Sequence, residues 1–533
     1  MSAKRCRIKR CALWLACILL VLLLTGCRAG RTSDISRAAD DNYCTAYEIF
    51  VFSFCDSNGD GTGDLNGVRS KLDYIKDLGF DAVWLTPVHP SATYHKYDVD
   101  DYCSIDPSFG TMEDYEALLK ECHDKGIRVY MDLVLNHTSD QHEWFRAASD
   151  YLHELPSGWE PDTSYCKYFD YYNFSREPLD GYVHLEGTEW YYEARFWSEM
   201  PDLNLNSEAV RTEIRNIMAF WLGKGVDGFR LDAVTSYFNN DTYANTEFLR
   251  FLKDTAGSID PDCSFVGEAW TDMDTIASLY TSGIDSLFDF PFASEEGLIA
   301  KTLNGSCGAS DFVEGMIQAE EAYSRANPDF TDAPFYTNHD MDRSASYYPE
   351  DNGPVTKMAY AVNLFMTGNA FVYYGEELGM EGAGKDENRR APMYWSDDPE
   401  DPDMCAGPPY MDEVQMKFPS LADQKKDGES LYSWFREVIR MRNAYPALAG
   451  GKTERAASVC DNDVAAFFRR SETDKDLLIV MNLRGQTAEK DLKAAGKGFK
   501  PVEKLCADNG KITYKNGILT MPAYSIAVFT GKK

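Results

Sequence analysis

Acidic and polar side chains stand at the ends of four short apolar runs, and their types suit the cleavage of a glycosidic bond. A single acid in such a place is most simply a buried structural residue. Because the carboxyl ends of parallel barrel strands converge on one pocket, four such ends together predict a site instead. The segments are Asp132-Leu-Val-Leu-Asn136-His137, Gly228-Phe-Arg230-Leu-Asp232-Ala233-Val234, Gly267-Glu268-Ala-Trp270 and Thr337-Asn338-His339-Asp340.

The elements that must position these side chains alternate between short strands and amphipathic helices. Most of the strands are continuous apolar runs, which is typical of strands buried on both faces of a parallel sheet. Eight of them predict a (β/α)8 barrel, a TIM barrel of the α/β class. The expected strands are Ala46–Phe52, Ala82–Thr86, Val129–Leu135, Gly228–Asp232, Phe265–Glu268, Ser286–Phe290, Pro334–Asn338 and Phe371–Tyr374.

Two further domains are expected besides this barrel, which would span residues 43–136 and 206–450. Roughly ninety residues separate the third strand from the fourth, too many for a simple helical crossover. The stretch 137–205 is rich in Tyr, Trp, Asp and Gly and predicts a small inserted domain. Strand-like runs and turn residues after residue 450 predict a C-terminal antiparallel β-sandwich over 451–533.

Two more segments extend the pattern, Met200-Pro-Asp202-Leu-Asn204 at the end of the expected insertion and Gly368-Asn-Ala-Phe-Val-Tyr-Tyr-Gly-Glu-Glu377 at the eighth strand. In this order, the six segments resemble the signature regions of the α-amylase family of glycoside hydrolases (family 13). The resemblance covers nearly the whole chain from about residue 43. The Met-Pro-Asp-Leu-Asn variant resembles the subgroup that is intermediate between oligo-1,6-glucosidases and neopullulanases.

The resemblance implies catalytic roles for three carboxyl groups. Asp232 would be the nucleophile, Glu268 the general acid/base, and Asp340 would bind the hydroxyls of the sugar at the cleavage point. A nucleophilic carboxylate and a protonated carboxyl about 5–5.5 Å apart cleave an acetal with retention of configuration. Glu268 must then be protonated at the working pH, so we expect burial and neighbouring carboxylates to raise its pKa.

The same resemblance implies a set of substrate-binding residues around the catalytic acids. Arg230 would hold Asp232 ionised, and Asp132 would play a supporting structural role. For Arg343 an ordinary surface arginine is the alternative, and for His339 an ordinary core histidine. The expected substrate-binding residues are Tyr97, Asp98, His137, Arg230, His339 and Arg343.

Three departures from the family pattern bear on specificity. Thr235 and Ser236 stand where many α-amylases have a Lys-His pair that binds sugar beyond the scissile bond. This leaves room for transfer or for action on short oligosaccharides. Ala233, directly after the expected nucleophile, favours α-1,4 over α-1,6 linkages, because α-1,6-specific relatives tend to have Val there. Lys96 replaces a common Gly before Tyr97.

A separate loop predicts a calcium site. Oxygen-bearing residues alternate along a Gly-rich stretch, as calcium requires, and the loop resembles the one after the first strand in oligo-1,6-glucosidase-like members. It is not an EF-hand, since Gly67 stands where the bidentate Glu would be, and a plain turn is the alternative. Asn136 is a candidate ligand for a second calcium. The expected Ca²⁺ ligands of the loop are Asp56, Asn58, Asp60, Thr62 through its carbonyl, and Asp64.

The first 42 residues read as an export signal and a tether. A basic start precedes an apolar run, 11–24, that is shorter than the ~20 residues of a spanning helix. Leu24-Thr25-Gly26-Cys27 resembles a bacterial lipobox, which implies cleavage after residue 26 and lipidation of Cys27; an uncleaved signal anchor is the alternative. Residues 27–42 would tether the protein to the outer side of a bacterial membrane.

The net charge limits the classes of ligand that the protein is expected to bind. The formal net charge of −33 disfavours nucleic acid and anionic lipid as ligands and suits a neutral substrate. The 14 cysteines show no zinc spacing, and their pairing cannot be read. We therefore expect a monomeric, calcium-binding, retaining hydrolase of α-1,4 links in starch or maltooligosaccharides. The alternatives are a 4-α-glucanotransferase, an α-glucosidase, or a non-catalytic glucan-binding surface protein, which would typically have lost catalytic carboxylates.

Overall fold

The computed structural model describes residues 43–398, 400–508 and 510–531. The expected signal peptide, the tether and the lipidation site at Cys27 lie outside the described residues. Within these ranges, none of the helices has both the length and the apolar character needed to cross a membrane.

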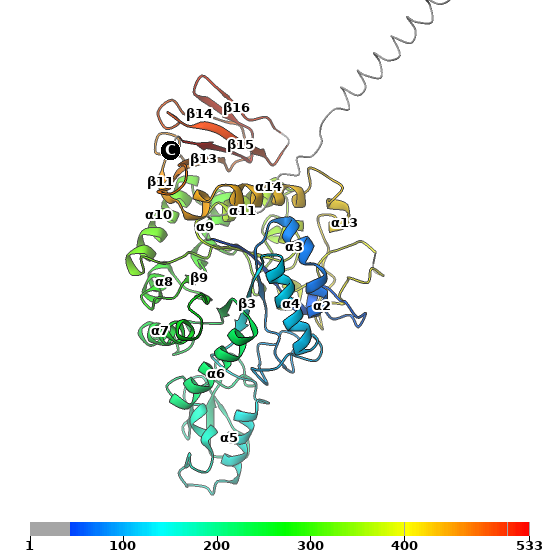
Figure 1. The fold of residues 1–533 in the computed structure, drawn as a ribbon, viewed down its shortest axis with the longest axis vertical. Helices are drawn as coiled ribbons and strands as arrows, with labels where there is room; N and C mark the ends of the chain where they lie inside the picture. Colours follow the sequence, from blue (N-terminus) through cyan, green and yellow to red (C-terminus); the bar gives the residue numbers. More distant parts are fainter. Residues whose placement is uncertain (1–42, 399, 509, 532–533) are drawn as a thin grey trace, which may run out of the picture.

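The centre of the molecule is a parallel sheet of seven strands in the order β10-β1-β2-β3-β7-β8-β9 (Figure 1). Nearly every residue of these strands is buried, as the continuous apolar runs predict. β1 pairs in parallel with β2 on one side and with β10 on the other, so the last strand returns to the first. The strands are β1 (Thr45–Ile49), β2 (Ala82–Leu85), β3 (Arg128–Leu133), β7 (Gly228–Leu231), β8 (Ser264–Gly267), β9 (Ser286–Leu287) and β10 (Ala370–Tyr373).

The remaining strand position of the barrel is filled by an irregular segment between β9 and β10, which we call the irregular stave. Phe288 forms a parallel bridge with Ala333, and the Phe371 N–H donates to the carbonyl of Pro334 at 2.9 Å. The segment expected as a strand over 334–338 therefore closes the ring with fewer regular ladder bonds than its neighbours. The expected (β/α)8 barrel is confirmed.

Helices surround this barrel, and their ends follow ordinary capping chemistry. Thr111 and Asp114 form a capping box at the start of α4, and Gly225 ends α6 with a left-handed φ of 101°. The helices are α2 (Leu65–Ser70), α3 (Leu72–Leu78), α4 (Met112–Asp124), α6 (Glu208–Lys224), α7 (Thr242–Ile259), α8 (Met273–Tyr280), α9 (Leu298–Leu303), α10 (Ala309–Ala326), α11 (Pro354–Leu364), α12 (Asp386–Arg389), α13 (Leu421–Gln424), α14 (Leu431–Ala444) and α15 (Ala447–Gly450). Short 3-10 turns are η1 (Val51–Ser53), η3 (Phe290–Phe292), η4 (Ser344–Tyr347) and η5 (Glu376–Leu378).

A small excursion separates β3 from α6, at the place where the sequence predicts an inserted domain. It contains α5 (Glu143–Glu154), η2 (Lys167–Tyr171) and a three-stranded antiparallel sheet of β4 (Phe174–Ser175), β6 (Tyr191–Glu193) and β5 (Tyr182–His184). In Figure 1 it projects from the barrel at the end opposite the C-terminal sheets.

The C-terminal part forms two antiparallel sheets, as expected. The larger has the order β11-β12-β13-β18-β15 and the smaller β14-β17-β16. Glu320 of α10 joins the barrel to the larger sheet, since it accepts hydrogen bonds from Thr453 and Arg469. The strands are β11 (Lys452–Arg455), β12 (Val464–Arg470), β13 (Leu477–Asn482), β14 (Ala488–Asp491), β15 (Lys500–Cys506), β16 (Thr513–Lys515), β17 (Ile518–Met521) and β18 (Ser525–Thr530).

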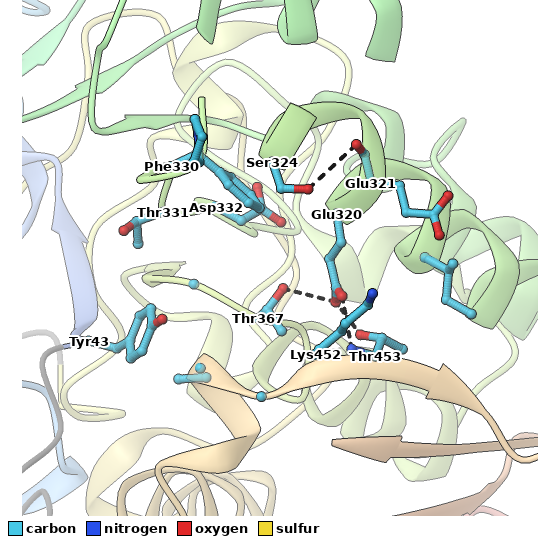
Figure 2. A pocket seen from close by; sticks show the side chains of 16 residues that line it. Tyr43, Glu320, Glu321, Ser324, Phe330, Thr331, Asp332, Thr367, Lys452 and Thr453 are labelled. Carbon is cyan, nitrogen blue, oxygen red and sulfur yellow. Dashed lines mark hydrogen bonds between the residues drawn. The ribbon is translucent and has the colours of Figure 1, made fainter. Parts of the chain in front are cut away.

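One cavity of about 330 Å³ lies at this junction, shown in Figure 2. Tyr43, Asp332 and Gly368 line it, and these residues come just before β1, the irregular stave and β10. The cavity therefore sits at the amino ends of the barrel strands.

Candidate active site

A second cavity, of about 350 Å³, lies at the opposite end of the barrel, where the strands finish. Asp232 directly follows β7, Glu268 directly follows β8, and Asp340 lies in the loop after the irregular stave. All three line this cleft, so the structure brings the three expected catalytic carboxyl groups together. The lining residues are His95, Tyr97, His137, Phe196, Met200, Asp232, Ala233, Thr235, Ser236, Glu268, Trp270, Asp340, Asp386 and Arg390.

Arg230 on β7 connects the two central acids. Its guanidinium is fully buried; Nη1 donates to Asp232 Oδ1 at 2.7 Å and Nη2 donates to Glu268 Oε2 at 2.6 Å. Two carboxyl groups that share one guanidinium in this way lie no more than roughly 8 Å apart, within the separations found in glycosidases. Nη1 also donates to both oxygens of Asp132 at 2.9 Å. Asp132 thus has the supporting role that the sequence predicts.

The environment of Glu268 suits a general acid. Burial, together with the charges of Asp232 and Asp340, raises its pKa to about 7 in spite of Arg230. The hydrogen bonds from Arg230 and from the backbone N–H of Ala233, at 3.1 Å, both fall on Oε2. The Oε1 atom is therefore the oxygen that can carry a proton toward the cleft.

The other two catalytic carboxyl groups differ strongly from each other. Burial raises the pKa of Asp232 to about 6, although Arg230 lowers it. Burial alone would also raise the pKa of Asp340, but the electrostatic pull of His339 and Arg390 brings it down to about 2. Near neutral pH the site therefore holds Asp340 ionised, while Asp232 and Glu268 titrate close to the working range.

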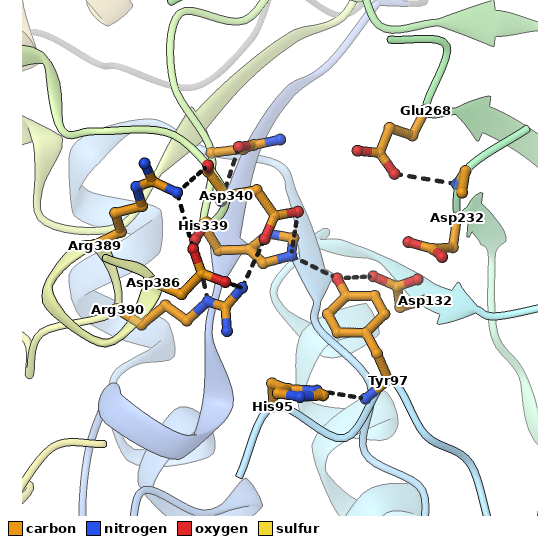
Figure 3. A network of polar contacts seen from close by, with 12 residues as sticks. His95, Tyr97, Asp132, Asp232, Glu268, His339, Asp340, Asp386, Arg389 and Arg390 are labelled. Carbon is orange, nitrogen blue, oxygen red and sulfur yellow. Dashed lines mark hydrogen bonds and ion pairs between the residues drawn. The ribbon is translucent and has the colours of Figure 1, made fainter. Parts of the chain in front are cut away.

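Tyr97 and His339 form one layer of polar contacts beneath the cleft (Figure 3). The Tyr97 hydroxyl donates to Asp132 Oδ2 at 3.0 Å and lies 2.8 Å from His339 Nε2. The two rings are stacked, with centroids 5.3 Å apart. His339 is fully buried and reaches the site through Asp340 and Tyr97. His137 lines the cleft directly, with Nε2 at 3.2 Å from the Tyr97 carbonyl.

Of the six residues expected to bind sugar, Tyr97 and His137 line the cleft, whereas four are buried behind it: Asp98, Arg230, His339 and Arg343. Asp98 is buried and accepts from Ser91 Oγ at 2.6 Å, so it holds the loop before Tyr97 together. Arg343 is fully buried and donates to the carbonyls of Tyr374 and Arg389. A side chain with no exposed surface cannot touch a ligand in this conformation. For Arg343, the motif spacing predicts the position of the backbone near the cleft but not the direction of the side chain.

Several cleft residues had no role predicted from the sequence: Trp270 stands in a strand-end segment, and the others come from loops without such a pattern. Arg390 follows α12 and donates to Asp340 Oδ1 at 2.7 Å and to the Tyr94 hydroxyl at 2.8 Å, and Asp386 lies beside it (Figure 3). Phe196 from the insertion and Trp270 after β8 expose about half of their surface, 52% and 55%. The run of Asp386, Arg389 and Arg390 in the sequence is the one signal that could have pointed to this wall.

The departures noted in the sequence all lie at the cleft or next to it. Thr235 and Ser236 line it. Ala233 adopts a left-handed φ of 45°, and its N–H bonds Glu268. Lys96 also has a left-handed φ, 66°, and its buried ammonium contacts Asp106 at 2.7 Å and the Ser91 carbonyl at 3.2 Å. The position where the family resemblance implies glycine therefore carries an ion pair here.

The loop expected to bind calcium forms the N-terminal approach to α2. Asp56 and Asp64 are buried there, and Asp56 accepts from the backbone N–H groups of Gly59 and Gly61, both at 2.7 Å. Two buried carboxylates with oxygen-bearing neighbours have the donor chemistry that calcium prefers. Across residues 43–531, positions 399 and 509 excepted, no three His, Cys, Asp or Glu side chains gather in a metal-binding group. Calcium therefore remains a prediction.

Asn136, the candidate ligand of a second calcium, donates through Nδ2 to Asp202 Oδ1 at 3.1 Å. This contact ties the end of β3 to the Met-Pro-Asp-Leu-Asn segment. A backbone bridge between His137 and Asp202 runs alongside it. The pair closes the insertion onto the barrel.

Carboxyl groups at the carboxyl ends of neighbouring barrel strands, joined by one buried arginine, define a barrel glycosidase that works with paired acids. The comparisons with known proteins agree. Residues 48–451 match the catalytic domain of alpha amylase. The chain belongs to the α-amylase family of glycoside hydrolases, and it is an enzyme of that class.

The chain is similar to several proteins over most of their length. It is 38% identical to "Alpha-amylase 3" of Dictyoglomus thermophilum, over 82% of this chain and 84% of that protein. It is 30% identical to an oligo-1,6-glucosidase of Heyndrickxia coagulans, over 84% of this chain and 92% of that protein. The solved structure of Eubacterium rectale Amy13B superimposes with a TM-score of 0.91 at 45% identity, covering 92% of this chain and 96% of that one.

Proposed function

We propose that this enzyme hydrolyses α-1,4-glucosidic bonds of starch or maltooligosaccharides with retention of configuration. Glu268 gives its proton to the leaving oxygen while Asp232 attacks the anomeric carbon and forms a glycosyl ester. Glu268, now ionised, takes a proton from water, and that water cleaves the ester and frees Asp232. Asp340 binds the hydroxyls of the sugar between them.

The observation that carries this proposal is the sharing of Arg230 between Asp232 and Glu268. One guanidinium stabilises the ionised nucleophile, and it leaves Oε1 of Glu268 facing a cleft in which burial favours its protonated form. These contacts, together with the higher pKa of Glu268, about 7 against about 6 for Asp232, support the two roles.

The test is a time course of products from starch, pullulan and maltoheptaose, with the anomeric form of the first products read by NMR. Internal cleavage of starch to α-anomeric maltooligosaccharides supports the proposal. Products with inverted configuration, or cleavage of only the α-1,6 links of pullulan, would reject it.

A second candidate is an α-glucosidase or a 4-α-glucanotransferase that acts on short maltooligosaccharides. Arg390 and Asp386 favour it, because they line the cleft beside Asp340 as a charged wall. The similarity to an oligo-1,6-glucosidase points the same way. Glucose released alone from chain ends would identify a glucosidase, and products longer than maltoheptaose would identify a transferase.

We also propose that the 56–64 loop binds calcium in a structural role. Side-chain oxygens of Asp56, Asn58, Asp60 and Asp64 and the carbonyl of Thr62 would hold the ion. Bound calcium would stabilise the folded protein by mass action. A fall in Tm on adding a chelator, restored by Ca²⁺ and absent in Asp60→Ala, supports this; an unchanged Tm would reject it.

The final proposal concerns location. A lipid on Cys27 would anchor a monomeric enzyme to the outer side of a bacterial membrane, where its substrate is available. Stable attachment needs more than one acyl chain, which a diacylglycerol supplies. Expression of the full chain and of Cys27→Ala in a bacterial host, followed by membrane fractionation, tests it. Equal release of both forms into the soluble fraction would exclude the anchor.

A further inference from the structure

Glu48 is a buried carboxyl group beneath the active site. It lies on β1, where its register partners are Trp84 on β2 and Tyr373 on β10. Its side chain is 2% exposed, so it does not face the cleft. Burial raises its pKa well above the usual range, although Arg230 lowers it. An acid in such a place is costly unless a neighbour uses its hydrogen-bonding groups.

The neighbour of Glu48 is His339. Glu48 Oε1 lies 2.7 Å from His339 Nδ1 and 3.3 Å from the His339 backbone nitrogen. On the other side of the ring, Nε2 lies 2.8 Å from the Tyr97 hydroxyl and 3.2 Å from Asp340 Oδ2. Figure 3 shows His339 between Asp340 and Tyr97. The imidazole thus links a buried acid on β1 to a carboxylate in the cleft.

A count of hydrogens decides which ring nitrogen carries the proton. Tyr97 has one hydroxyl hydrogen, and we assign it to the carboxylate oxygen Asp132 Oδ2 at 3.0 Å rather than to His339 Nε2 at 2.8 Å, because a charged acceptor makes the stronger hydrogen bond. Arg230 Nη1 only donates, and it approaches the Tyr97 oxygen at 3.3 Å. With this assignment, His339 Nε2 faces two acceptors, the Tyr97 oxygen and Asp340 Oδ2, and we infer that it is the N–H nitrogen.

The remaining ring nitrogen, Nδ1, then has a lone pair and needs a donor. Burial lowers the pKa of His339 to about 3 and raises that of Glu48, so the protonated carboxyl of Glu48 supplies that donor. Its Oε1–H donates to Nδ1, and a lone pair of the same oxygen accepts from the backbone N–H of His339. The opposite tautomer would place the Nε2 lone pair 3.2 Å from an ionised carboxylate oxygen of Asp340 and would repel it.

We propose that Glu48 is a positioning residue for hydrolysis: by donating a hydrogen bond to His339 Nδ1 it fixes the ring with its N–H toward Asp340 and so holds Asp340 in place for the sugar. This inference rests on the proposed function, in which Asp340 binds the substrate at the cleavage point. Glu48 itself does not touch the substrate.

The first test compares two substitutions at this position. Glu48→Gln keeps a donor of similar length, because its amide N–H can reach Nδ1, and we expect kcat within about threefold of the wild type. Glu48→Met removes the donor at similar volume, and we expect kcat to fall about tenfold or more with a smaller change in KM. Equal loss in both variants, or unchanged kcat in Glu48→Met, would overturn the proposal.

The matched control is Glu377, which is equally buried but accepts from Tyr47 and Tyr74, away from the cleft. Glu377→Met should lower Tm and leave kcat of the folded enzyme unchanged. In a His339→Ala background, Glu48→Met should cause no further loss of kcat, since the residue through which it acts is gone. An additive loss would show a purely structural role.

One measurement does not depend on a substitution at Glu48. The ¹⁵N NMR signals of histidine-labelled protein report which ring nitrogen carries hydrogen, and the His339→Ala spectrum assigns the signals of His339. The proposal requires hydrogen on Nε2; hydrogen on Nδ1 alone would overturn it. Wild-type turnover of maltoheptaose, measured in parallel, shows whether the proposed function itself holds.

Discussion

The barrel has two cavities of similar volume at its two ends, about 350 Å³ in the cleft and about 330 Å³ at the junction with the C-terminal sheets. Behind each lies a fully buried arginine, Arg230 in the first case and Arg469 in the second. The two ends therefore share a cavity of similar volume and a buried cation. The difference lies in the number of acids around each guanidinium.

Arg230 faces Asp132, Asp232 and Glu268, whereas Arg469 faces Glu320. Although burial lowers it, the carboxylates around Arg230 raise its pKa well above the usual range, while burial lowers the pKa of Arg469. At the junction one cation matches one anion. In the cleft the acids outnumber the cation, and this surplus adds to the burial that raises the pKa of Glu268 to about 7.

The largest expected effect comes from replacing Glu268, one of the three acids around Arg230. Glu268→Gln keeps the shape of the side chain and a contact to Arg230 but has no proton to give, so kcat on maltoheptaose should fall by about 1000-fold or more. Substrate binding, measured by calorimetry, and Tm should change little. Retained turnover would show that Glu268 is not the general acid/base.

The protonation of Asp232 and Glu268 can also be tested by varying the pH. As pH falls through about 6, Asp232 gains a proton and loses its nucleophilic charge. As pH rises through about 7, Glu268 loses the proton it must donate. We expect a bell-shaped kcat/KM with its maximum between these values and about tenfold loss per pH unit outside them. A plateau from pH 5 to 9 would contradict these assignments.

A smaller effect is expected at Lys96, which forms a buried one-to-one ion pair with Asp106 directly before the cleft residue Tyr97. Lys96→Gly relieves the left-handed backbone but leaves Asp106 buried without its cation, so we expect a net loss of about 2 kcal/mol of unfolding free energy. KM should rise a few-fold, because Tyr97 is the next residue. Adding Asp106→Asn should restore most of the stability; a double variant no better than Lys96→Gly would refute the pairing.

The smallest effect on activity is expected at the junction. Glu320→Gln leaves Arg469 buried without a charged partner and should cost about 3 kcal/mol of unfolding free energy. The cleft lies at the other end of the strands, so kcat of the folded enzyme should stay at the wild-type value. Denaturant unfolding and initial rates at low temperature measure the two quantities. A large fall in kcat with unchanged stability would contradict the division into a catalytic end and a structural end of the barrel.

The sequence predicts the barrel and the centre of the site because both depend on strand ends. Asp232, Glu268 and Asp340 meet since the carboxyl ends of parallel strands must converge, whatever the loops do. Arg230 is predicted for a related reason: two residues along a strand place its side chain on the same face as Asp232. Pro334–Asn338 was expected as a strand, and the weaker ladder of this irregular segment is not visible in composition.

The rim of the cleft could not be predicted in the same way. Arg390 and Asp386 reach it from a long loop whose path depends on packing against the barrel. Arg343 was expected at the sugar, but the loop after Asp340 turns its guanidinium toward the carbonyls of Tyr374 and Arg389. Motif spacing determines where the backbone passes, and only tertiary contacts determine which way a long side chain points.

The backbone at Ala233 has a consequence for how such an enzyme can change during evolution. A β-branched residue is strained at a left-handed φ, so valine at this position would tend to rotate the peptide. The same peptide N–H holds Glu268 Oε2. A substitution here would therefore also shift the acid strength of Glu268. If residue 233 sets the linkage preference, as the family resemblance implies, the two properties would have to be readjusted together.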